Sequence, residues 1–269
     1  MARPKSLHSI QESDEHKYIN MLLFGHPGTG KTVFWSTGNE SVLFLDSDPG
    51  LGTQTAKSFG SKAFVMPVTD YEELQEAYEY CKHDLAKDLP SVRWVVWDSL
   101  TMFQERTLID DIMPDVVAEN PRQEEFVPSR REYLMNMNRI GRYCRLFVEL
   151  PFNFGVTCHV EIEKDEAENS MLYMPMVQGR NMPSKVAGYM NVVGYLGKAK
   201  VKENGKDVTV QRLLTTQVGK FYAKDRFHAL GQHIDRPTLP KLEALIDAKR
   251  SASKSAAPTP LRRRRPAAG

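Results

Sequence analysis

The stretch Gly25-His-Pro-Gly-Thr-Gly-Lys-Thr32 decides the fold, because it matches the phosphate-binding pattern GxxxxGK[ST] in full. It directly follows an apolar run at residues 18–24 and precedes a short helix-like run at residues 32–36. Glycines let backbone N–H groups surround a phosphate, and the N-terminus of the following helix adds partial positive charge. The pattern therefore predicts a strand, a phosphate-binding loop and a helix.

We expect every residue of this loop to contact the bound phosphates: Gly25, His26, Pro27, Gly28, Thr29, Gly30, Lys31 and Thr32. Lys31 should neutralise the β- and γ-phosphates, and the hydroxyl of Thr32 should ligate Mg²⁺. The alternative is a glycine-rich turn that binds nothing.

Apolar, β-rich runs recur along the chain between helix-like stretches, which is typical of parallel βαβ units. We predict strands at 18–24, 41–45, 63–66, 93–97 and 153–158. Between them we predict one helix that starts with a capping box at Thr69 and Glu72, and another over 129–150 whose inner face includes Leu134 and Cys144. The expected fold is α/β: a mostly parallel central sheet with helices on both faces.

After Val160 the pattern changes. Residues 161–185 are polar and lead us to expect an irregular segment, whereas strand-like runs at 191–196 and 208–216 predict an antiparallel C-terminal extension of the sheet. A short helix at 240–248 should end the folded part. We therefore expect a flexible N-terminal arm (1–17), one domain (18–248) and a disordered basic tail (249–269).

The composition limits the class of protein. With 269 residues, 41% hydrophobic and 26% charged, the chain resembles an ordinary globular protein, which excludes disorder throughout and a collagen-like repeat. The net charge of +2 combines a strongly basic tail with an acidic body, so general nucleic-acid binding through overall charge is not indicated. Three cysteines without metal-ligand spacing, and no apolar run of membrane length, favour a cytoplasmic protein without a membrane partner.

Two further strands end in acidic residues. The run at 93–97 delivers Asp98 to the carboxyl edge of the sheet, where it should hold Mg²⁺ together with Thr32. The run at 41–45 is followed by Asp46 and Asp48, and hydrolysis needs a carboxylate that activates water near the γ-phosphate. We assign that role to Asp48, with Asp46 as the second choice; a simple turn at Asp-Pro-Gly is the alternative.

His159 follows the strand at 153–158, so it should reach the γ-phosphate and sense its loss. A hydrogen-bonded histidine without a ligand is the alternative. Farther along, Lys224 and Arg226 are separated by one residue in a strand-like context and should point to the same side. Such a pair could stabilise the γ-phosphate of a neighbouring subunit, or could simply be solvated.

With these residues in place, the chain resembles the RecA-like P-loop ATPases, and most closely the phage nucleotide-binding and single-strand annealing proteins of the fourth Sak-type group. The motifs that carry the resemblance are GHPGTGKT, FLDSDPGL, VVWDSLT, TCH and KDRFHALG. KDR followed by an aromatic residue is also similar to the Lys-Asn-Arg-Phe-Gly element of RadA recombination factors. Asp48 lies where the RecA family has a catalytic Glu, and His159 where it has a γ-phosphate-sensing Gln.

The resemblance implies an ATPase with ATP and Mg²⁺ as cofactors that assembles into rings or filaments on single-stranded DNA and anneals or exchanges strands. It implies that Lys224 and Arg226 act across a homo-oligomer interface, that residues 161–185 hold the DNA-binding loop, and that a single-strand-binding protein is a further partner. If the chain is phage-encoded, it would act in the cytoplasm of an infected bacterium. A small-molecule kinase and a non-catalytic scaffold organised by ATP remain alternatives.

Overall fold

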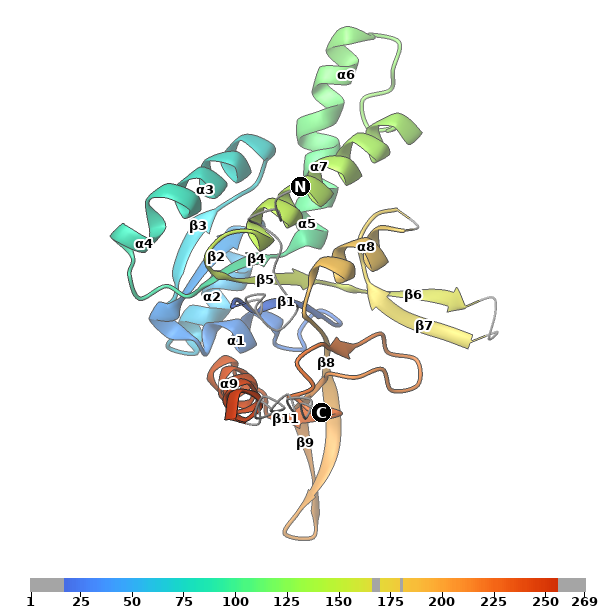
Figure 1. The fold of residues 1–269 in the computed structure, drawn as a ribbon. Coiled ribbons are helices and arrows are strands. Elements are labelled where there is room, and N and C mark those ends of the chain that lie inside the picture. The colour runs from blue at the N-terminus through green and yellow to red at the C-terminus, as the bar shows by residue number, and fades with distance from the viewer. Residues whose placement is uncertain (1–16, 166–169, 180, 256–269) are drawn as a thin grey trace, which may run out of the picture.

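A computed structural model of the chain describes residues 17–165, 170–179 and 181–255. Its centre is a nine-stranded sheet with the strand order β11-β9-β8-β1-β5-β4-β2-β3, in which β10 pairs with β8 (Figure 1). β8, β1, β5, β4, β2 and β3 run parallel, and β9, β10 and β11 are antiparallel to their neighbours. The predicted fold class, with its antiparallel C-terminal part, is therefore confirmed.

The strands of this sheet are β1 (Asn20–Phe24), β2 (Val42–Asp46), β3 (Phe64–Pro67), β4 (Trp94–Asp98), β5 (Asn153–Cys158), β8 (Val192–Glu203), β9 (Lys206–Leu214), β10 (Lys224–Asp225) and β11 (His233–Asp235). A separate hairpin consists of β6 (Val160–Asp165) and β7 (Ser170–Pro175). The helices are α1 (Lys31–Ser36), η1 (Asn39–Ser41), α2 (Leu51–Ser58), α3 (Tyr71–His83), α4 (Leu85–Asp88), α5 (Leu100–Arg106), η2 (Thr107–Ile112), α6 (Met113–Glu119), α7 (Arg130–Val148), α8 (Met182–Tyr189) and α9 (Leu239–Ser255).

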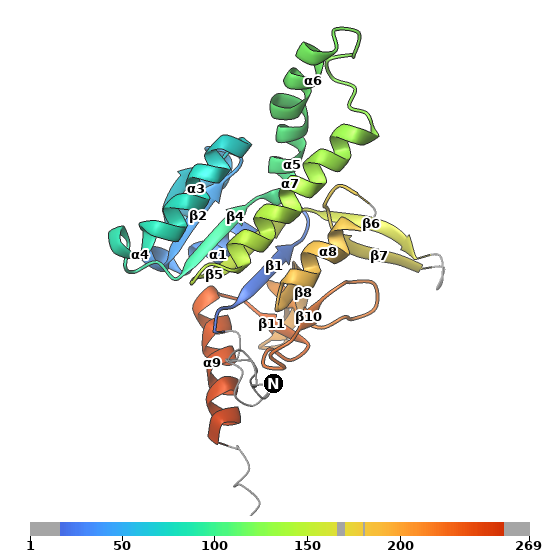
Figure 2. The same cartoon turned by 45° about the horizontal axis from the view of Figure 1, so that its top comes forward.

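Two hydrophobic cores lie on opposite faces of the sheet, because side chains along each strand alternate between the faces. Helices α3, α5, α7 and α8 cover one face, and α1 and α9 cover the other (Figure 2). The three tryptophans are fully buried. Each indole N–H donates a hydrogen bond: Trp35 to Thr157, Trp94 to Glu243 and Trp97 to Ser47.

The strand order places β5 between β1 and β4. Phe24 is paired with Cys158, and Asp46 with Asp98, so the parallel strands end at one common edge. The loops that follow these strands therefore all begin at the same edge of the sheet. This is where open α/β sheets bind ligands.

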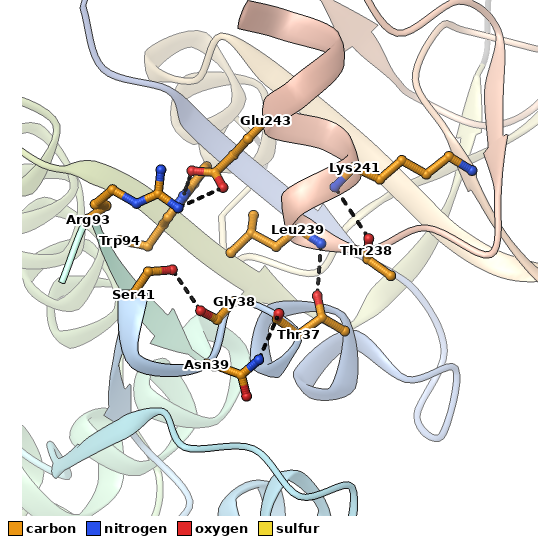
Figure 3. A network of polar contacts seen from close by, with 10 residues as sticks. All are labelled: Thr37, Gly38, Asn39, Ser41, Arg93, Trp94, Thr238, Leu239, Lys241 and Glu243. Carbon is orange, nitrogen blue, oxygen red and sulfur yellow. Dashed lines mark hydrogen bonds and ion pairs between the residues drawn. The ribbon is translucent and has the colours of Figure 1, made fainter. Parts of the chain in front are cut away.

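Helix α9 is fastened to the sheet by a polar network (Figure 3). Glu243 accepts hydrogen bonds from Arg93 Nη2 at 3.1 Å and from Trp94 Nε1 at 3.0 Å. At the start of the helix, the Leu239 backbone N–H donates to Thr37 Oγ1 at 2.8 Å. These bonds join the C-terminal helix to β4 and to the end of α1.

The structure corrects several sequence-based expectations. The described part of residues 161–185 is not irregular, because it contributes to the β6–β7 hairpin and to α8. The N-cap of α3 is Asp70, which accepts from the Glu73 backbone N–H, so the capping position lies one residue later than we predicted. Helix α9 continues to Ser255, so residues 249–255 are helical and not part of a disordered tail.

Helix α7 starts with a capping box formed by Ser129 and Glu132, so the predicted start of this helix at residue 129 is confirmed. Cys144 is buried on its inner face, but Leu134 is 53% exposed and does not belong to that face. The predicted N-terminal arm at residues 1–16, residues 166–169 and 180 of the predicted DNA-binding segment, and the predicted tail at 256–269 lie outside the described residues.

Cys81, Cys144 and Cys158 are all buried free thiols. No helix in the part of the chain that the structure describes is both long enough and apolar enough to cross a membrane.

Candidate nucleotide-binding site

The loop after β1 has the backbone of a phosphate cradle. Gly28 and Gly30 adopt positive φ angles of 74° and 92°, which L-residues with a side chain rarely adopt. The turn is closed by Thr29, whose hydroxyl donates to the His26 carbonyl at 2.8 Å. Helix α1 begins directly after Gly30 and directs its N-terminal N–H groups toward this loop.

Lys31 is buried at the first position of α1. Its Nζ donates to the carbonyls of Gly25 at 2.9 Å and His26 at 3.1 Å, so the amine lies across the loop. Burial lowers the pKa of Lys31, and the nearby Asp98 partly opposes this by favouring the charged form. A bound phosphate would compensate the buried charge better than carbonyl groups do.

Thr32 and Asp98 form the part of the site that suits Mg²⁺. The Thr32 hydroxyl donates to Asp98 Oδ2 at 2.7 Å, which brings a hydroxyl and a carboxylate oxygen to one point. Burial raises the pKa of Asp98, while the bonds to Thr32 and the charge of Lys31 lower it. The described residues contain no cluster of three or more His, Cys, Asp or Glu side chains that could hold a metal alone. The Thr32 hydroxyl and the Asp98 carboxylate suit Mg²⁺, which proteins bind through one or two side chains together with substrate phosphates.

A cavity of about 270 Å³ opens at this edge of the sheet. The predicted residues that line it are Pro27, Gly28, Gly30, Lys31, Thr32, Asp46, Asp48, Asp98 and His159. The structure therefore brings together the loop and the acidic or polar ends of β2, β4 and β5. Sequence reasoning missed the remaining lining residues: Val33, Gly52, Thr55, Ser99, Met102 and Thr157.

The two aspartates after β2 have different surroundings. Asp46 is buried and accepts hydrogen bonds from the backbone N–H of Asp48 and from the Thr53 hydroxyl, so it holds the turn together. Burial raises its pKa. Asp48 is only half-buried and lines the cavity. Of the two, Asp48 is the one whose carboxylate is not already used by the turn.

His159 is held at the tip of β5 by its own backbone. Its N–H donates to Thr101 Oγ1 at 3.0 Å, and its carbonyl accepts from the Met176 N–H at 2.9 Å. Burial lowers the pKa of the half-buried imidazole, and the charge of Lys31 adds to this effect. The lowered pKa favours the neutral ring, which can offer an N–H to an anion.

Lys224 and Arg226 do not line the cavity of their own subunit. Arg226 is exposed and donates to the Gly188 carbonyl at 3.3 Å. Burial and the neighbouring Arg226 lower the pKa of Lys224 to about 8, so the two cations are close to each other. Between them, Asp225 is buried and its carboxylate accepts from the N–H groups of Phe227, Ala229 and Leu230. Asp225 therefore shapes the turn that presents both cations.

Gln211 of β9 is a contact that sequence reasoning could not find. Its Nε2 donates to the Thr29 carbonyl at 2.9 Å, across 182 positions of the chain. No local motif marks such a residue, since only the folded sheet brings β9 to the loop.

The comparisons with known proteins agree with this geometry. A family model described as an AAA domain matches residues 17–227. No curated protein matches the chain. Because the family match covers most of the 269 residues, the chain belongs to the AAA domain family and has the fold of a P-loop ATPase.

Proposed function

We propose that the protein hydrolyses ATP in the cavity at the carboxyl edge of the sheet and uses this activity on single-stranded DNA, as a recombination or annealing protein. The observation that carries the ATPase part is the convergence of Lys31, the Thr32–Asp98 pair and Asp48 in one cavity. The DNA part rests on the resemblance to RecA-like annealing proteins.

Binding of the triphosphate falls to the loop and Lys31. The loop N–H groups surround the β-phosphate, and Lys31 exchanges the carbonyls of Gly25 and His26 for phosphate oxygens. Mg²⁺, held by Thr32 and Asp98, would neutralise charge on the phosphates.

Hydrolysis needs a base for the attacking water. Asp48 accepts a proton from the water while the water oxygen forms a bond to the γ-phosphorus. At the same time, the bond between the γ-phosphorus and the β–γ bridging oxygen breaks. The products are ADP and inorganic phosphate. His159, neutral and anchored between β1 and β4, donates a hydrogen bond to the γ-phosphate and loses this partner when phosphate leaves.

The site is completed by a second copy of the chain. Lys224 and Arg226 do not line the cavity of their own subunit, and Lys224, whose pKa is lowered by burial and by the neighbouring Arg226, gains a compensating charge when it meets an anion. We assign both to the γ-phosphate of a neighbouring subunit in a homo-oligomer, where they stabilise the charge of the transition state.

The test is ATP turnover by an equimolar mixture of Lys31→Ala and Lys224→Ala subunits, with and without single-stranded DNA. Each variant alone should be inactive, and mixing should restore turnover at interfaces that combine an intact Lys31 with an intact Lys224. Stimulation by DNA supports the recombination role. Turnover that depends on an added metabolite and not on DNA would instead support a kinase. DNA annealing that survives in Asp48→Asn would support the scaffold.

A further inference from the structure

Strands β8 and β9 extend beyond the sheet as a two-stranded ribbon, which we define as residues 197–211. The two strands of the ribbon pair with each other from Lys198–Gln211 to Glu203–Lys206. Figure 1 shows the ribbon projecting from the body of the domain at the bottom of the view. One face of the ribbon is exposed, whereas on the opposite face Ala199, Val201 and Val208 are half-buried and Val210 is buried.

One face of the ribbon carries a row of cations. Lys198, Lys200 and Lys202 alternate with smaller or apolar residues and are all exposed. Alternate residues of a strand lie on one face about 6.8 Å apart. The residues directly opposite, on the same face, are Gln211, Thr209 and Asp207, so this face holds three cations and one acidic residue.

The lysines are available to a partner. Among the described residues, no ion pair or side-chain hydrogen bond involves the amines of these three lysines. The acidic residue at the tip, Glu203, lies on the other face and is paired with Arg236. A regular row of unpaired amines fits an extended chain of evenly spaced negative charges, which is what a nucleic-acid strand offers.

The segment first expected to bind DNA has the opposite charge. Glu161 and Glu163 share one face of the β6–β7 hairpin, since they are two residues apart in β6. Glu161 is exposed. Carboxylates on a projecting hairpin repel phosphates, so the described part of this hairpin is a poor binding surface for DNA.

The base of the ribbon forms a wall of the nucleotide loop. Gln211 donates to the Thr29 carbonyl, and its side-chain amide lies directly against Gly30. On the neighbouring strand, the Leu196 carbonyl lies directly against Gly25. Because Gln211 is opposite Lys198, the face with the lysines begins at the loop that holds ATP.

We propose that the face of the ribbon with Lys198, Lys200 and Lys202 binds the phosphodiester backbone of single-stranded DNA, and that Gln211 connects this contact to the nucleotide loop. This inference rests on the proposed function, for which it supplies the DNA-binding surface. It assigns to the ribbon the DNA-binding role that the resemblance implies for residues 161–185.

The experiment measures the salt dependence of binding to a fluorescent oligothymidylate, for the full chain and a variant with Lys198→Gln, Lys200→Gln and Lys202→Gln. Three lost phosphate contacts should reduce the slope of log affinity against log salt by about 2. The matched control removes three exposed lysines elsewhere, with Lys57→Gln, Lys82→Gln and Lys87→Gln, and should keep the slope. A variant with arginine at the three ribbon positions should keep it too, and thermal unfolding of each variant shows that it is folded.

The outcomes separate the two proposals. If the unmodified protein binds the oligonucleotide and the ribbon variant keeps the same slope, the ribbon inference is wrong and the DNA role stands. If the unmodified protein does not bind the oligonucleotide, the DNA role itself is wrong. Displacement of the oligonucleotide by polyglutamate at equal charge concentration would assign the ribbon to an acidic protein instead, and would also overturn the inference.

Discussion

The hydroxyl of Thr32 donates a 2.7 Å hydrogen bond to Asp98, which is 66 positions away in the chain. The bond joins the start of α1 to the end of β4, although β5 separates β1 from β4 in the sheet. The two elements that the proposed Mg²⁺ site requires therefore already lie together in the folded chain.

We expect Asp98→Asn to weaken ATP binding in the presence of Mg²⁺ by about 10- to 100-fold, because the metal loses its only carboxylate from this pair. Binding of ATP in excess EDTA should change little. Thr32→Ser, which keeps a hydroxyl, is the matched control and should retain Mg²⁺-dependent binding. Equal losses with Mg²⁺ and with EDTA in Asp98→Asn would contradict the assignment.

Asp48→Asn should reduce the rate constant of hydrolysis by about 10²- to 10⁴-fold and leave ATP affinity nearly unchanged, because it removes only the proton acceptor. Asp46→Asn should behave differently, since Asp46 holds the turn and its loss affects folding. Single-turnover hydrolysis and thermal unfolding of both variants distinguish the roles. If Asp46→Asn abolishes hydrolysis in a fully stable protein and Asp48→Asn does not, the assignment is reversed.

ATP turnover should fall as the pH rises through about 8, because Lys224 then loses the charge that acts on the neighbouring γ-phosphate. We expect a decrease of about fivefold between pH 8 and pH 9, as the protonated fraction falls. The loss is not unfolding: the folded-state pKa lies below 10.5, so the contribution of Lys224 to stability rises with pH between these values. Lys224→Arg keeps its charge and should move the decrease to higher pH. An identical pH profile for the two proteins would argue against Lys224.

Glu243→Ala should lower the free energy of unfolding by about 1–3 kcal/mol, because the buried Trp94 indole N–H loses its acceptor (Figure 3). Glu243→Gln keeps an acceptor oxygen and should recover much of this. Glu203→Ala, which breaks an exposed ion pair with Arg236, should have a much smaller effect. Urea unfolding of the three variants measures the differences, and equal midpoints for Glu243→Ala and Glu203→Ala would contradict the role of the network in fastening α9.

Gln211→Ala should remove the stimulation of ATP turnover by single-stranded DNA without changing the salt slope of DNA binding, since the lysines remain. The matched control is Thr209→Ala, which lies on the same face but two residue pairs farther from the loop. It should keep the stimulation. Loss of stimulation in both variants, or in neither, would show that Gln211 does not connect the ribbon to the loop.

The strands and the nucleotide loop could be predicted because their signals are local. The run from Trp94 to Trp97 is buried on both faces and has the apolar pattern of a central strand. The pattern GxxxxGK[ST] directly identifies the residues of the nucleotide loop. The strand ends then placed Asp98, Asp48 and His159 at one edge, because parallel strands share that edge.

Other parts could not be predicted, for physical reasons that differ from place to place. The β6–β7 hairpin has an apolar face on which Ile162 pairs with Tyr173, but the glutamates Glu161 and Glu163 in β6 led us to expect a polar, irregular segment. The residues after Ala248 have the composition of a disordered tail, yet α9 continues to Ser255. Gln211 depends on contacts between β9 and the loop, which only the folded sheet creates.

The measurement that tests the central claim most directly is equilibrium binding of labelled ATP at millimolar Mg²⁺, with the folded wild-type chain and Lys31→Ala side by side. The account predicts saturable binding by the wild type and an affinity lower by at least about tenfold in Lys31→Ala, which loses the cation that meets the β- and γ-phosphates. A folded wild-type chain that retains no ATP, or a Lys31→Ala chain that binds it equally well, would contradict the account.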